Sequence, residues 1–167
     1  MKRGAAALVA LIAVFGGACG GSKAAVGVSG EDIKPIAASK LPATLLGLEV
    51  HEEDMKSTIA QTEDSYVDAV SLFSLRGDNL VQATLQVSHL TKAFDYRSAR
   101  QRANLADKIG GARATTYRVG RTTVYVTQGL RQRISVWFSG RTLLVLSARD
   151  DLAKPRGLLR AVVDLNL

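Results

Sequence analysis

Apolar and polar residues alternate strictly in the middle of the chain, and this pattern constrains the fold more than any other feature. Within residues 80–88, LVQATLQVS, apolar side chains occupy the odd positions from 81 to 87 and polar side chains the even positions from 82 to 88. A period of two residues is typical of a β-strand with one buried face. Residues 67–75 have the composition of a second strand, and the turn-forming sequence RGDN lies between the two. The pattern therefore predicts an antiparallel hairpin.

The second half of the chain predicts four more strands. They cover residues 114–120, 122–129, 131–140 and 142–149. A glycine lies at or next to each of the three junctions between these segments, as is typical of tight turns. Because consecutive strands joined by tight turns must run in opposite directions, we expect these four segments to extend an antiparallel sheet.

Two helices are expected beside the strands. Ser98 and Gln101 have the spacing of a capping box, small and apolar residues follow at helical spacing, and Gly110 and Gly111 end the segment. Pro155 suits the first turn of a second helix, which we expect over residues 155–165. The order of elements predicts an α+β fold, an antiparallel β-sheet with helices packed on one face.

The segment over residues 31–65 is less regular. Pro35 and Pro42 interrupt it, and residues 41–50 suit either a short strand or an irregular segment over the core. Residues 52–61 begin with three acidic side chains, which favour the positive end of a helix dipole. We therefore expect a short helix there.

The N-terminus has the layout of a secretory signal peptide. Lys2 and Arg3 precede an apolar run over residues 5–15, and small residues follow. This run is shorter than the ~20 residues that a membrane-spanning helix needs. We expect a signal peptide over residues 1–18, a flexible tether over 19–30 and a single α+β domain over 31–167.

Cys19 is the only cysteine of the chain, and it follows the small residues directly. The sequence FGGAC resembles the lipobox of bacterial lipoproteins. That resemblance implies an acylated Cys19 that anchors the protein to the extracytoplasmic side of the cell membrane. Gly16 stands where the family usually has leucine, so cleavage by ordinary signal peptidase and a secreted protein remain the alternative. The order of elements in the domain is similar to that of small α+β folds of the Mog1/PsbP kind, and that likeness carries no functional motif.

Charge divides the chain into an acidic part and a basic part. Residues 23–75 hold four lysines and nine acidic residues, and residues 76–167 hold sixteen basic and six acidic residues. Most of the basic residues in the second part are arginines, which pair well with phosphate and carboxylate groups. The second part therefore predicts an anionic partner.

One strand face carries the candidate ligand-binding residues. Alternation over residues 131–140 places Arg131, Arg133 and Trp137 on the side opposite an apolar row. The same alternation places Tyr125 on the outer side of the neighbouring strand. If the two rows adjoin, they form a surface for anionic, partly apolar ligands. The alternatives are a face that is simply solvated and a helix that covers Trp137.

Catalytic and metal-binding patterns are weak. The chain has two histidines, no nucleophile-elbow sequence and no glycine-rich phosphate loop before a helix. We therefore predict no catalytic residues, no metal and no cofactor. The predicted function is a membrane-anchored, non-enzymatic binding module for an anionic lipid, a cell-wall polymer or an envelope protein, with no nucleic-acid partner. The alternatives are a carrier of an apolar ligand in an internal pocket and, third, an envelope enzyme.

Overall fold

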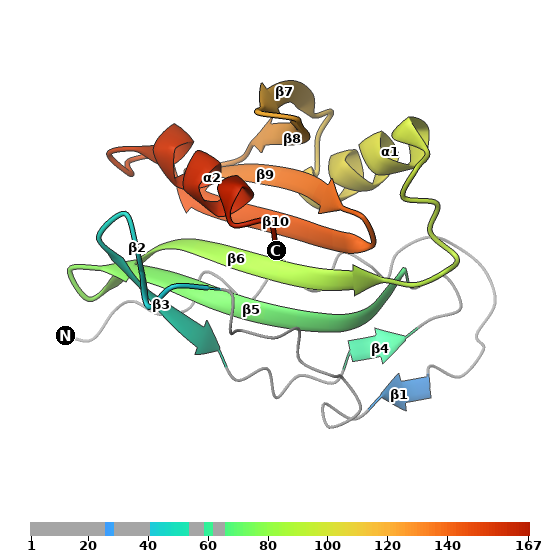
Figure 1. The fold of residues 1–167 in the computed structure, drawn as a ribbon, viewed down its shortest axis with the longest axis horizontal. Coiled ribbons are helices and arrows are strands. Elements are labelled where there is room, and N and C mark those ends of the chain that lie inside the picture. Colours follow the sequence, from blue (N-terminus) through green and yellow to red (C-terminus); the bar gives the residue numbers. More distant parts are fainter. Residues whose placement is uncertain (1–25, 29–40, 54–58, 62–65) are drawn as a thin grey trace.

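The computed structural model describes residues 26–28, 41–53, 59–61 and 66–167 (Figure 1). The expected signal peptide and Cys19 lie outside these residues. Of the expected tether, the structure describes Val26–Val28, which form strand β1 and pair with strand β4 (Ile59–Gln61). Of the helix expected over residues 52–61, the described parts are strand: Glu52 and Glu53 end strand β3, and Ile59–Gln61 are β4. The remainder, 54–58, lies outside the described residues.

The main sheet has eight antiparallel strands among the described residues. In spatial order they are β2 (Thr44–Leu45), β3 (Leu48–Glu53), β5 (Val67–Gly77), β6 (Leu80–Leu90), β10 (Thr142–Arg149), β9 (Gln132–Ser139), β8 (Thr122–Gln128) and β7 (Thr115–Val119). The last four strands form a meander, and β10 joins it to β6 in the middle of the sheet. The order leaves β2 and β7 at the two edges.

Tight turns join the long strands where the sequence predicted them. Asp78 and Asn79 connect β5 to β6 with φ angles of 51° and 61°, as a type I′ hairpin requires. Gly120 and Gly140 begin the turns before β8 and β10, each with a φ of 58°. A glycine with positive φ at the first central position is the requirement of a type II′ turn.

The two helices pack on opposite faces of the sheet. Helix α1 (Ala99–Gly110) shares one buried cluster with Leu143 and Val145 of β10, whereas helix α2 (Pro155–Asp164) shares another with Leu144 and Leu146. Successive residues of a strand point to opposite faces, so the two clusters lie on the two sides of the same strand. Figure 1 shows α2 in front of β9 and β10, and α1 to the right of α2, near the arrowhead of β9.

The expected α+β class with an antiparallel sheet and packed helices is confirmed. The expected placement of both helices on one face differs from the structure. The reason is the composition of β9 and β10, which carry apolar side chains at odd and even positions alike. A strand that is apolar on both sides needs a cover on both sides. Neither described helix is long and apolar enough to cross a membrane.

Candidate functional site

The predicted ligand-binding residues do not form one surface. Tyr125 pairs with Val136 across β8 and β9, and Trp137 pairs with Val124, so the two aromatic side chains point to opposite faces. Tyr125 is 5% exposed in the cluster under α1, and Trp137 is 3% exposed in the cluster under α2. The expected alternation between buried and exposed residues therefore does not apply to β9.

The two arginines of the prediction have different environments. Arg131 is exposed in the turn before β9, where its φ is 64°. Arg133 is half-buried on the same face as Trp137, one strand over from Ala148. Its Nε donates to Oε1 of Gln128 over 3.4 Å. Of the four predicted residues, Arg133 is the one in the lining of the cavity described next.

That cavity is a groove of about 210 Å³ on the α2 face of the sheet. We call it the arginine groove, and its lining comes from α2 and from all four strands of the meander: Tyr117, Arg118, Val119, Val126, Arg133, Ser135, Leu146, Ala148, Pro155, Arg156 and Leu159. Its volume is below the range of roughly 300–1,000 Å³ that is usual for small-molecule sites. It therefore suits a small group or part of a larger ligand.

Strand pairing makes the apolar floor of the groove. Val126, Ser135 and Leu146 are neighbours across β8, β9 and β10, and Ala148 lies next to Arg133. Ser135 is 3% exposed. The floor is thus an apolar surface with one hydroxyl, and Arg133 lies at its border.

Helix α2 and strand β7 make the walls. Pro155 and Arg156 belong to the first turn of α2, and Leu159 follows one turn later. Tyr117 of β7 is 51% exposed on the opposite side. Four of the five residues of β7 are exposed, so the helix leaves this edge of the sheet uncovered. The groove is the space left between the helix and the edge of the sheet.

The groove is electropositive. Three arginines and no acidic residue line it. Within the described part of the chain, none of these three arginines forms an ion pair. Arg118 and Tyr117 are adjacent in β7, so their side chains point to opposite faces of the sheet. The Nη1 of Arg118 donates to the carbonyl oxygen of Arg121 over 3.3 Å. Arg133 and Arg156 are therefore the two guanidinium groups best placed for a ligand.

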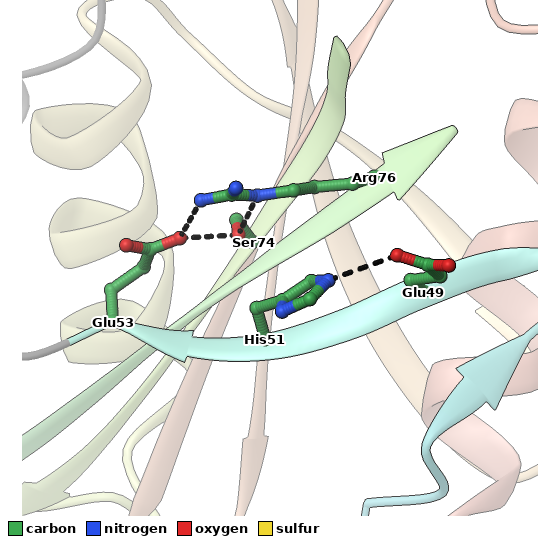
Figure 2. Close-up of polar contacts among 5 residues, drawn as sticks. All are labelled: Glu49, His51, Glu53, Ser74 and Arg76. Atoms are coloured by element: carbon green, nitrogen blue, oxygen red, sulfur yellow. Dashed lines mark hydrogen bonds and ion pairs between the residues drawn. The ribbon is translucent and has the colours of Figure 1, made fainter. Parts of the chain in front are cut away.

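A second polar cluster lies on β3 and β5 (Figure 2). Glu53 accepts hydrogen bonds from the Ser74 hydroxyl and from Nη2 of Arg76, the latter over 2.8 Å. Arg76 Nε also donates to Ser74 Oγ over 3.0 Å. These hydrogen bonds lower the pKa of the Glu53 carboxyl, and the bond from Ser74 has the larger effect. Beside them, Nε2 of His51 lies 3.1 Å from Oε2 of Glu49.

This cluster has the residue types of a catalytic site without the required contacts. The Ser74 hydroxyl donates to Glu53, whereas a serine nucleophile needs a hydrogen bond to a base such as His51. The side chains of His51 and Glu49 are 47% and 71% exposed. The described residues hold no group of three His, Cys, Asp or Glu side chains that could bind a metal ion. The cluster is an ion-pair network on the sheet face.

Sequence reasoning missed most of the groove. Tyr117, Ser135 and Arg156 come from three elements, and only the strand order brings them together. Arg156 directly follows Pro155, so the predicted helix start was the one local signal for it. A comparison of the chain with protein families, curated proteins and solved structures found no match in any of the three.

Proposed function

We propose that the protein is a non-enzymatic, extracytoplasmic binding module, anchored through Cys19, and that the arginine groove holds the anionic group of an envelope component. The observation that carries this proposal is that Arg133 and Arg156 line the same groove, over an apolar floor and with no acidic residue in the lining. Guanidinium groups pair with phosphate and carboxylate through directed hydrogen bonds. The ligand chemistry is therefore a phosphate or carboxylate joined to a small apolar or sugar group.

The volume of the groove limits what enters it. A space of about 210 Å³ accommodates a glycerol phosphate or a comparable head group, and a lipid tail or polymer would continue outside. This supports the binding module over the alternative carrier, which would enclose a whole apolar ligand. Envelope lipids and cell-wall polymers both present phosphate in this form, so the experiment has to separate these two sources.

Calorimetric titration of the full chain at low salt tests the groove. The probes are glycerol phosphate, dihexanoyl phosphatidylglycerol and, as a lipid with a zwitterionic head group, dihexanoyl phosphatidylcholine, each below its micelle concentration. Binding of phosphatidylglycerol alone points to a lipid head group, and equal binding of glycerol phosphate points to a polymer unit. Failure of both anionic probes, or equal binding of the phosphatidylcholine, contradicts the proposal.

Matched arginine variants locate the binding site. We expect Arg133→Gln and Arg156→Gln each to weaken binding about tenfold or more, which corresponds to about 1.4 kcal/mol. Arg160→Gln is the control, because Arg160 lies on the same helix, is 79% exposed and is not among the groove residues. A loss of affinity in the control as large as in the other two would mean that general charge, and not the groove, binds the ligand.

The anchor needs a separate measurement. Mass spectrometry of the full chain, expressed in a bacterium and extracted from its membranes, should give a mass increased by the acyl groups on Cys19. An unmodified mass together with protein in the medium would favour the secreted alternative. The groove proposal does not depend on this result.

A further inference from the structure

Strand β7 is an open edge of the main sheet. It pairs with β8 on one side, and no described element pairs with its other side. Four of its five side chains are exposed. Its sequence, TTYRV, consists mainly of β-branched and aromatic residues, which favour extended backbone. Such an edge offers unpaired backbone donors and acceptors to another strand.

The turn after β7 determines which backbone groups point outward. Val119 and Thr122 close a two-residue turn, and in a hairpin of this type the closing pair exchanges both backbone hydrogen bonds. Hydrogen-bonded pairs then alternate with non-hydrogen-bonded pairs along β7. The backbone N–H and C=O groups of Thr116 and Arg118 therefore face away from β8. No hydrogen bond to either group from outside the sheet is present among the described residues.

The surroundings of this edge are strongly basic. Between Asp107 and Asp150 the chain holds eight basic residues and no acidic residue. Arg113 precedes β7, Arg118 lies on it and Arg121 follows in its turn; all three are exposed. A second copy of the chain paired antiparallel along β7 would bring the same arginines face to face, and like charges in that arrangement are destabilising. The charge thus disfavours self-pairing and favours an acidic occupant.

We propose that β7 binds an extended acidic segment of another protein by strand addition. Side chains of an added strand alternate between the two faces of the sheet. On one face they adjoin Tyr117 and Val119, and on the other they adjoin Thr116 and Arg118. The segment that fits is one in which apolar residues alternate with glutamate or aspartate. This edge borders the arginine groove, since Tyr117, Arg118 and Val119 belong to both, whereas Arg133 and Arg156 of the groove lie on other elements.

The test uses a labelled octapeptide in which glutamate alternates with valine, capped at both ends, and measures fluorescence anisotropy with the full chain. Thr116→Pro removes one outward N–H, and proline is tolerated at such an edge position because the N–H does not contribute to the ladder with β8. We expect at least tenfold weaker binding for Thr116→Pro and unchanged binding for Thr116→Val. A peptide with lysine in place of glutamate should not bind.

A modification of the peptide keeps the test valid even where Thr116→Pro unfolds the protein. N-methylation of alternate peptide residues blocks either the edge that faces β7 or the opposite edge. We expect one of the two methylated peptides to lose binding at least tenfold and the other to retain it. Equal behaviour of the two, or equal binding of the lysine peptide, overturns the proposal.

Two further results distinguish this surface from the groove and from self-association. Arg133→Gln should leave peptide binding unchanged, and Thr116→Pro should leave the titration with phosphatidylglycerol unchanged. Sedimentation of the free full chain in detergent should give one copy per micelle. A dimer that Thr116→Pro dissociates would mean that the edge serves self-association, against the proposal.

Discussion

The contact between Gly110 and Thr127 shows how one residue sets the position of a helix. A Cβ atom built on Gly110 would lie 2.1 Å from Oγ1 of Thr127, so glycine is required for α1 to lie this close to β8. The same closeness buries Thr127, whose hydroxyl has no hydrogen-bond partner among the described residues. A buried hydroxyl without a partner destabilises the folded state.

Thr127→Val should therefore stabilise the protein. The substitution keeps the shape of the side chain and removes the unpaired hydroxyl, so we expect the free energy of unfolding to rise by about 1 kcal/mol. Urea denaturation measures the change. Thr123→Val is the matched control, because Thr123 lies on the same strand and face but is only half-buried; its change should be within about 0.5 kcal/mol. If both substitutions raised the free energy of unfolding equally, the gain would come from the higher strand propensity of valine and not from removal of the buried hydroxyl.

Glu53 gives the protein a pH-dependent contribution to stability. The pKa of its carboxyl is lowered in the folded state, so the charged form stabilises the fold at pH values above the ordinary pKa of a glutamate. This stabilisation is lost as the pH falls through the lowered pKa. The side chain is 36% exposed, so the contribution should stay below about 1 kcal/mol. Glu53→Gln should be less stable than the parent at pH 7.

Urea unfolding of Glu53→Gln at a series of pH values measures this effect. The stability difference from the parent should shrink as the pH is lowered below the ordinary glutamate range, because the parent carboxyl then becomes neutral as well. Glu52→Gln serves as the control, since Glu52 is exposed on the other face of β3 and should give no difference at any pH. A constant difference for Glu53→Gln would mean that the charge of the carboxylate contributes nothing.

At the scale of elements, local signals predicted most of the fold. The strands from β5 to β10 and both helices lie within a few residues of their expected positions, because alternation, turn glycines and Pro155 are local features. One of the two hydrogen bonds of the predicted capping box is present: Ser98 Oγ accepts from the backbone N–H of Gln101. The Gln101 side chain accepts instead from the backbone N–H of Asp95, in the loop before the helix. The local sequence pattern thus predicts where α1 begins, whereas the partner of the Gln101 side chain depends on the conformation of the preceding loop.

The faces of the strands were harder to predict than their positions. The assignment of Trp137 to an outer surface assumed that β9 has one buried side, as β6 has in its sequence pattern. In the structure β9 is central and covered by a helix on each side, so Val136 and Trp137 are both buried. The burial of both faces of β9 depends on where α1 and α2 pack, so alternation within the one strand could not predict it. Arg133 is only half-buried because it lies near the start of β9, at the border of the groove beside α2.

At the scale of the whole molecule, one sheet separates two cores. The α1 cluster and the α2 cluster share the backbones of β8, β9 and β10, although they share no side chain. Leu143 and Leu144 are adjacent in β10, point to opposite faces and are at most 1% exposed. The loss of either core should therefore weaken the strands on which the other depends, and the main sheet with its helices should unfold as one unit.

The substitutions Leu143→Ala and Leu144→Ala test this coupling. Each should lower the free energy of unfolding by about 2–5 kcal/mol, the usual cost of truncating a buried leucine. Trp137, the only tryptophan, lies on the side of Leu144 and reports the α2 core by fluorescence, while far-UV circular dichroism reports the whole fold. In both variants the two signals should change at the same urea concentration. If Leu143→Ala shifts the circular dichroism transition and leaves that of Trp137 in place, the two cores unfold independently and the sheet does not couple them.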